Sequence, residues 1–571
     1  KSIEWRRLMR TILCVLFLGF LITGCTPAPP EADPITEDVT TEPLAVLIGS
    51  TGTYGRVIST DSTLAQQFFD QGLRLTWGYA FPEAVASFQE AIRHDPDHPM
   101  LYWGLALSLG PNPNSRAGGL PDDPQGAARQ AISQGMQYLD NGNEAERAFV
   151  ETLSIRFDSD AIPDRDERDQ AYLAAARELF ERYPNDPDAG SLLGDAYMIT
   201  RPGRFYWDED GGPIRGTAEA KATLETVMAV RPDHPGANHL YIHLLESSNM
   251  PEEALPAADR LAALMPGAGH IVHMPSHIYV RVGQHTKSVE HNQRSADADA
   301  EFLTIWGDRD FPKTGTYFLS AENHRRHAYD FIRYSAAIQG NYDRAVEAAT
   351  NAREHEPQER IQRGAANKTI ATRWLVKKMF GRWNELLEED RVMEGSPYLD
   401  GMWYYTQGSG QVGRGDLEAA EQSLEHIVAI ANDPASATIR RNANYVSELM
   451  EIAAFALEGE IMESRSDLDG AITNYQAAIE IEDTLAYTEP PDWAQPVRQY
   501  LGAALLDADR PEDAEAVYRQ DLIENRNNGW SLFGLWQSLE IQGRIAEAAE
   551  ARADFETAWE HSDVELERSR F

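Results

Sequence analysis

The chain has 571 residues, 42% of them hydrophobic, so it can bury more core than one ordinary domain and is not a disordered polypeptide. Its 91 acidic residues against 51 basic ones give a formal net charge of −40, which repels nucleic acid and anionic lipid headgroups. We therefore expect no nucleic-acid partner.

The first 24 residues are organised like an export signal. Arg6, Arg7 and Arg10 precede the apolar run TILCVLFLGFLI, and the small residues of LITGC come directly before Cys25. Charged, apolar and cleavage regions in this order are typical of a signal peptide, whereas a membrane-spanning helix needs a longer apolar run. The segment resembles a bacterial lipoprotein signal, and the resemblance implies that Cys25 is lipidated and becomes the first residue of the mature chain.

A lipidated Cys25 has consequences for location and for chemistry. The resemblance implies a protein of the bacterial cell envelope, attached to a membrane through its lipid anchor, in the outer membrane or on the periplasmic face. Cys14 leaves with the signal, so no thiol remains for a disulfide or a metal. Residues 25–60 are rich in Pro, Thr and acidic residues without periodicity, which predicts a disordered linker.

Amphipathic helices punctuated by Gly, Pro and Asp-Pro pairs fill the chain from residue 61 onward, which predicts an all-α fold. In AQQFFDQGLRLTWGYAFPEAVASFQEAIRHDPDHP, Gly72 marks a close approach of two helices, and Ala84 and Phe88 have the packing spacing of the second helix. This unit resembles a tetratricopeptide repeat (TPR), a helix-turn-helix unit of about 34 residues. Similar units recur almost to the C-terminus.

The repeats predict a TPR-like α-solenoid of stacked antiparallel helix pairs with irregular insertions. The insertions are expected at residues 111–125, 202–216, 301–320 and 484–496. We divide the array into an N-terminal region (61–235), a His-rich central region (236–355), a C-terminal region (356–562) and a tail (563–571). Stacked repeats leave one helix of each pair on a concave face, and that groove commonly holds a protein or peptide partner.

Histidines are concentrated in the central region, where ten of the fifteen lie within residues 234–327. In HPGANHLYIHLLES, His239, His243 and Glu246 stand at i, i+4 and i+7, so all three project from one face of a helix. A single histidine pair at this spacing is more often a satisfied polar pair than a metal site. The hypothesis of a site therefore depends on the neighbouring segments.

The segment AGHIVHMPSHIY adds three more histidines. Pro275 suits the first turn of a helix, which places His277 in that turn and His270 and His273 on the loop that enters it.

A third segment, AENHRRHAYDF, carries His324 and His327 at i and i+3 on one helix face. The three segments start successive helix pairs, and packed helices lie about 8–10 Å apart, so we expect their imidazoles to meet on the concave wall. Neutral imidazoles bind Cu, Zn, Fe or Ni, with Cu and Zn foremost here. The predicted metal ligands are His239, His243, His273, His277, His324 and His327.

Nearby residues have other predicted roles. Glu246 is placed to complete a mixed metal site or to act as a general base toward a metal-bound water. Alternatively, Glu246, like His270, orients the ligating imidazoles. Met274 fits a core position better than that of a copper ligand. His285 and His291 are expected to face solvent.

A wider resemblance groups these segments together. The combination of FDQGLRL, EAVASFQEAI, HPGANHLYIHLLE, PGAGHIVHMPSHIYVRVG and NNGWSLFGL resembles a large family of bacterial TPR proteins, usually exported, over about residues 64–560. The resemblance implies architecture more than activity. Two Pro-rich segments, GPNPN at 110–114 and EPPDW at 489–493, are weaker candidates for lining the ends of the groove.

Two functions of different classes fit these features. The first is a membrane-anchored binding module whose groove captures a protein, peptide or other ligand and holds a His-rich transition-metal site. The second is a metal-dependent enzyme, a hydrolase using metal-bound water or a copper or iron oxidase. Without a metal, the histidines would line a pocket for an anion or peptide, or pack structurally. We find no P-loop, nucleophile elbow or HExxH sequence.

Overall fold

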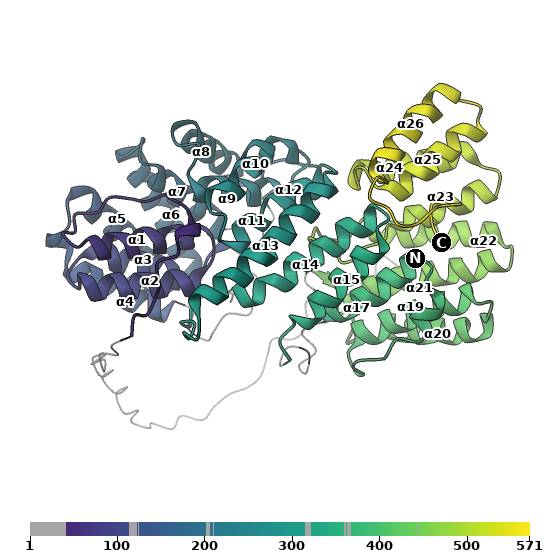
Figure 1. Cartoon of the computed structure of the whole chain (residues 1–571), viewed down its shortest axis with the longest axis horizontal. Coiled ribbons are helices and arrows are strands. Elements are labelled where there is room, and N and C mark those ends of the chain that lie inside the picture. Colours follow the sequence, from purple (N-terminus) through teal and green to yellow (C-terminus); the bar gives the residue numbers. More distant parts are fainter. Residues whose placement is uncertain are drawn as a thin grey trace, which may run out of the picture. The chain divides into compact units, whose positions relative to one another are not determined.

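Helices make up nearly all regular structure in the computed structural model (Figure 1), which describes residues 42–113, 123, 125–200, 206–208, 210–314, 321–358, 361, 367–441 and 443–571. The predicted all-α class is confirmed over these ranges. The strands found there, β1 (Arg440–Arg441) and β2 (Asn444–Tyr445), form one short antiparallel hairpin. Residues 44–571 form one compact unit.

The helices before residue 310 are α1 (Thr63–Trp77), α2 (Phe81–His94), α3 (Pro99–Leu109), α4 (Gly126–Gln137), α5 (Glu144–Phe157), α6 (Arg165–Arg182), α7 (Pro187–Ile199), α8 (Thr217–Val230), α9 (Pro235–Leu245), α10 (Leu255–Leu264), α11 (Gly269–His273), α12 (Pro275–Arg281) and α13 (His285–Trp306). Those after it are α14 (Ala321–Ile338), α15 (Tyr342–Glu354), α17 (Asn367–Met379), α18 (Trp383–Leu387), α19 (Pro397–Gly413), α20 (Leu417–Ala431), α21 (Val446–Ser464), α22 (Leu468–Glu482), α23 (Val497–Asp507), α24 (Pro511–Glu524), α25 (Gly529–Ile541) and α26 (Ile545–Ala558). Short 3₁₀ turns lie at Gly49–Thr51, Leu139–Asn141 and Pro251–Ala254.

Consecutive helices pack against each other as antiparallel pairs, as in α1 with α2, α21 with α22 and α25 with α26 (Figure 1). The second helix of one pair also contacts the first helix of the next pair: α2 contacts α3, and α24 contacts α25. This is the stacking expected of a TPR-like α-solenoid. The predicted insertion at 484–496 runs without a helix between α22 and α23.

Glycines on the first helices let the aromatic ring of a second helix approach closely. A Cβ at Gly104 would lie 2.1 Å from the ring of Phe88, and one at Gly534 would lie 2.1 Å from the ring of Tyr518. Both distances are far below van der Waals contact, so any larger residue at either position would push the helices apart.

The hydrophobic core has two main parts within this unit. The first includes Phe88, Trp103 and Leu240, and the second includes Trp374, Leu457 and Tyr518. The histidine-bearing helices α9, α11 and α12 contribute to the first part, whereas α14 contributes to small separate clusters. Met274 is fully buried in the first part, as predicted.

The predicted disordered linker is wrong at its inner end. Residues 44–60 pack on the helices, because Leu44 N–H donates to Glu90 and Ile48 N–H donates to Gln71. The tail is also folded down, with Ser569 buried and 2.6 Å from the Tyr518 hydroxyl. Composition did not reveal either contact, since both depend on partners distant in sequence.

Several predictions concern the start of the chain. The signal peptide at 1–24, the lipidated Cys25 and the linker up to residue 41 lie outside the described residues. None of the helices in the described ranges combines the length and apolar character that a membrane crossing requires.

Candidate metal centre

Four helices bring the central histidines together. His239 and His243 lie one turn apart on α9, His270 and His273 on α11, His277 on α12, and His324 and His327 on α14. His270 and His273 were predicted on a loop, but they lie on a helix that begins at Gly269. Pro275 divides this helix into α11 and α12, because proline has no N–H for the helical hydrogen bond. All seven imidazoles belong to one connected set of rings, with neighbouring centroids 4.7–6.2 Å apart.

Six of these histidines form two triads, each with three potential ligand nitrogens within 4.8 Å of one another. The first triad is His239, His243 and His270, and the second is His273, His277 and His327. The triads adjoin, since the ring centroids of His243 and His277 lie 6.0 Å apart. The predicted convergence of the imidazoles is thus present, with His270 inside a triad rather than behind one.

Each triad contains one close pair of Nε2 atoms. His239 Nε2 lies 3.1 Å from His270 Nε2, and His273 Nε2 lies 2.9 Å from His277 Nε2. Two imidazole lone pairs at this distance repel unless a proton or a cation lies between them. Two nitrogen ligands of a tetrahedral zinc ion, with bonds near 2.0–2.1 Å, are about 3.3 Å apart, so the pairs are close to ligand spacing.

Hydrogen bonds at the opposite ring nitrogen fix which nitrogen faces the cluster. His239 Nδ1 donates to the Trp77 carbonyl at 2.6 Å, and His273 Nδ1 donates to Asn292 Oδ1 at 2.6 Å. The Asn292 amide is oriented by its Nδ2, which donates to Ser276 Oγ at 2.8 Å. With the proton held on Nδ1, the Nε2 lone pair is left for a ligand, which is the common arrangement around histidine metal sites.

Glu246 performs the same task for two more rings. Its carboxylate lies 3.2 Å from His243 Nδ1 and 2.9 Å from His277 Nδ1. Both oxygens face imidazole N–H groups, which is the geometry of the orienting carboxylate that the sequence offered as one role for Glu246; the role of a general base stays a prediction. Glu489 also contacts His277 Nδ1, and the three residues form a further group with metal-ligand spacing.

Burial and mutual repulsion keep most of the imidazoles neutral. Burial, and then the charge of neighbouring imidazoles, holds the pKa values of His270, His273 and His327 well below the ordinary value. Burial would also lower the pKa of His277, but the charges of Glu246 and Glu489 raise it to about 9. Neutral imidazole is the form that binds transition metals, so His277, which is protonated at neutral pH, would have to release a proton when it binds a metal.

Two aromatic residues close the cluster off from water. The ring of Tyr79 lies 4.4 Å from that of His239 and 5.7 Å from that of His243. The ring of Phe331 packs 4.6 Å from that of His273. Tyr79 has φ 56°, a left-handed conformation that a bulky residue rarely adopts and that is frequent at functional sites.

His324 lies beside the triads and belongs to neither. Its Nδ1 donates to Asp299 Oδ2 at 2.8 Å, and its Nε2 has no hydrogen-bond partner among the described residues. A cavity of about 20 Å³, lined by His270, His324 and Glu83 among others, is large enough for one water. The predicted ligand role of His324 thus remains a prediction.

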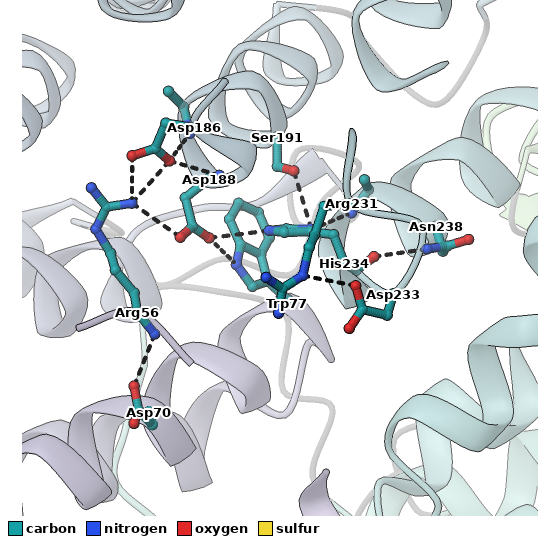
Figure 2. A network of polar contacts seen from close by, with 12 residues as sticks. Arg56, Asp70, Trp77, Asp186, Asp188, Ser191, Arg231, Asp233, His234 and Asn238 are labelled. Carbon is teal, nitrogen blue, oxygen red and sulfur yellow. Dashed lines mark hydrogen bonds and ion pairs between the residues drawn. The ribbon is translucent and has the colours of Figure 1, made fainter. Parts of the chain in front are cut away.

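Trp77, which holds the His239 ring, is itself fixed by the network in Figure 2. Its Nε1 donates to Asp188 Oδ1 at 3.1 Å, and Asp188 is also 3.1 Å from His234 Nε2 and 3.2 Å from Arg56 Nη1. Burial alone would raise the pKa of Asp188, but the hydrogen bond and charge of His234 and the charge of Arg56 lower it to about 2.

The other central histidines were partly mispredicted. His285 is not solvent-facing: it is 5% exposed, and its Nε2 donates to the carbonyl of Arg526 at 3.1 Å. His291 is part-buried and donates to the carbonyl of Val272. The loop before α13 is covered by the α24–α25 turn, which sequence spacing cannot show.

The residues that complete the cluster were mostly not predicted. Trp77, Asn292 and Asp299 carried no local signal, because each meets its histidine only through tertiary packing. Glu489 lies in the EPPDW segment, whose Pro-rich insertion into the repeats was the one feature that pointed to it.

Solved structures similar to this chain are helical proteins with low sequence identity. The APC/C hetero-tetramer Cut9–Hcn1 is 13% identical, with 90% of this chain and 77% of that chain covered and a TM-score of 0.26. The human IFIT1 dimer with m7Gppp-AAAA is 15% identical, with 76% and 85% covered and a TM-score of 0.30. A monomeric IFIT1 mutant with Gppp-AAAA is 14% identical, with 84% and 95% covered and a TM-score of 0.33.

These likenesses are too distant to bear on function. No family model matches the chain, and no curated protein matches it significantly. The fold therefore rests on the helix pairs themselves, and TPR-like arrays are in general protein-binding scaffolds.

Proposed function

We propose that this chain is a metalloprotein that holds a pair of transition-metal ions in the two histidine triads of a TPR-like scaffold. One observation carries the proposal: four of the six triad imidazoles, on three helices, have Nδ1 beside an oxygen acceptor, and each triad contains a close pair of Nε2 atoms; the four are His239, His243, His273 and His277. This arrangement leaves Nε2 lone pairs facing one another, as around a histidine metal site. Copper and zinc are the foremost candidates, and iron and nickel also accept imidazole ligands.

Metal titration of chelator-treated protein tests the proposal. We expect two equivalents of Zn²⁺ or copper per chain by competition with a chelating dye. The pair His239→Ala with His243→Ala should leave one equivalent, and so should His273→Ala with His277→Ala. His561→Ala, which removes an exposed histidine far along the chain, is the control and should leave two. Binding below half an equivalent in the intact protein, or binding indifferent to both pairs, would refute the metal site.

A metal-dependent enzyme is the second candidate, because a cavity shares Glu489 with the cluster. Metal-bound water would support hydrolysis, and paired copper would support oxidation. Zinc-loaded protein is tested with 4-nitrophenyl acetate and copper-loaded protein with catechol and O₂. Turnover that is lost in His277→Ala and retained in His561→Ala supports an enzyme, whereas no turnover with either probe leaves the binding module as the conclusion.

Two further proposals concern partners and location. The array would present a protein or peptide ligand in its groove, in keeping with the general use of TPR-like folds. The chain would be held in the bacterial cell envelope by lipid on Cys25. Cys25→Ser should abolish incorporation of labelled palmitate, whereas Cys14→Ser, inside the proposed signal, should not; labelling that survives Cys25→Ser would overturn the anchor.

A further inference from the structure

A cavity of about 180 Å³ lies beside the metal cluster, between α12, α14 and the 484–496 insertion. For comparison, an engineered cavity of about 150 Å³ in another protein binds benzene. Glu489 belongs to both the cavity wall and the cluster. The exposed Glu524 also lines the cavity, so the cavity opens to the protein surface.

Two polar side chains on this wall have hydrogen-bonding capacity that no described residue uses. Glu482 accepts a hydrogen bond from Val497 N–H at 3.1 Å and forms no ion pair within the described part of the chain. Burial raises the pKa of the Glu482 carboxyl to about 8, so the group is protonated at neutral pH unless a cation binds beside it. His285 donates through Nε2 to the Arg526 carbonyl, which leaves Nδ1 as an acceptor.

Of the two groups, His285 Nδ1 is the stronger evidence that the cavity binds a ligand. The residue is only 5% exposed, and this nitrogen has no hydrogen-bond partner among the described residues. Burial lowers the His285 pKa to about 4, so the ring is neutral and its Nδ1 accepts a hydrogen bond. Leaving such a buried atom unsatisfied is unfavourable, and a hydrogen-bond donor on a ligand would satisfy it.

Three aromatic side chains also belong to the wall. Tyr334, Tyr487 and Trp493 line the cavity, and such rings attract a cation over their faces. Trp493 is 7% exposed, and its Nε1 has no partner in the described ranges, so the wall also offers one donor to an oxygen on the ligand. Arg281 is the cationic side chain on the wall, and it is engaged by the Ser248 carbonyl and the Tyr487 ring.

We propose that this cavity binds a small organic amine in its ammonium form. The acceptors Glu482 and His285 receive its N–H groups, and the aromatic rings enclose its carbon skeleton. The volume favours a free amine of about benzylamine size over a lysine side chain carried by a protein. This binding site is independent of the proposed metal, although Glu489 places the ligand next to the cluster.

Calorimetric titration of three probes of one size tests the charge requirement. Benzylamine should bind with a Kd at least tenfold lower than benzyl alcohol, and benzoate should not bind. The measurement is made on chelator-treated protein, because an amine can itself coordinate a metal ion. Binding that appears only after metal is added would assign the amine to the ions, which would overturn the cavity site and support the metal proposal.

Variants then locate the site. Glu482→Gln should weaken benzylamine at least tenfold, whereas Glu480→Gln, an exposed carboxylate on the same helix, should leave the Kd unchanged. Ala486→Leu should fill the cavity and block binding, which keeps the test open if Glu482→Gln fails to fold. The proposal is wrong if folded Glu482→Gln and Ala486→Leu both bind as the parent does, if benzoate binds as tightly as benzylamine, or if an acetylated lysine peptide binds more tightly.

Discussion

Replacing Asn292 by leucine tests whether fixed imidazole tautomers create the metal centre. Asn292 is fully buried and is not a predicted metal ligand, but its Oδ1 accepts a hydrogen bond from His273 Nδ1 at 2.6 Å. Leucine removes that acceptor, so the proton is free to move to Nε2 and block the ligand position. Loss of such an outer partner typically lowers metal affinity 10–100-fold, equivalent to about 1.4–2.7 kcal/mol.

The same change also costs stability, and the two effects must be separated. Leucine leaves His273 Nδ1 and Ser276 Oγ without their present partner, at a cost of about 1–3 kcal/mol each in the free energy of unfolding. Asn528 is the matched control, because it is also fully buried and its amide bonds Asp521 and the Trp530 N–H away from the histidines. Asn528→Leu should lose stability and keep metal affinity.

The assay is chelator competition for affinity and urea unfolding of metal-free protein for stability. Asn292→Asp retains an acceptor and should bind metal at least as tightly as the parent protein. If Asn292→Leu and Asn528→Leu lower stability alike and both keep the parental Kd, the tautomer argument fails.

Three more predictions concern stability. The pKa of Asp188 is depressed to about 2 from 3.8, so its contribution to stability is full above about pH 4 and is lost as the pH falls to about 2 and the carboxylate is protonated. At 1.36 kcal/mol for each pKa unit, this contribution is about 2 kcal/mol. Urea unfolding measured across this pH range should show that much less pH dependence in Asp188→Asn than in the parent protein. Gly534→Ala should lower the free energy of unfolding by about 1–3 kcal/mol, because its Cβ meets the Tyr518 ring, whereas Gly49→Ala has open space and should be neutral in the same assay. Metal at a free concentration 100-fold above Kd should stabilise the protein by about 2.7 kcal/mol for each ion bound, and a melting temperature unchanged by chelation would contradict site-specific binding to the folded state.

Local spacing predicted the fold and the inner histidines, and long-range packing supplied the rest. The i, i+4 spacing of His239 and His243 places both on one helix face, and the helical stacking of the repeats was sufficient to infer that other segments meet them. The acceptor for His239 is the Trp77 carbonyl, 162 residues away in sequence. No periodicity records such a contact.

The errors have the same origin. His285 was expected at the surface because it follows a glycine turn, yet the α24–α25 turn covers it. The i+7 spacing of Glu246 left its role open between base, ligand and orienting group, because its contacts with two imidazole N–H groups depend on the rotamers of His243 and His277. Residues 44–60 have the composition of a tether, and their order comes from partners on α1 and α2.

The packed segment at residues 44–60 also determines how mechanical tension enters the molecule. A pull on the chain before Leu44 is borne first by hydrogen bonds from Leu44 to Glu90 and from Ile48 to Gln71, and then by the ion pairs of Arg56 with Asp186 and Asp188. Asp188 also accepts the hydrogen bond of Trp77 Nε1, so tension that reached Arg56 would be passed to the residue that holds the His239 ring. The N-terminal segment is thereby mechanically connected to the imidazole cluster.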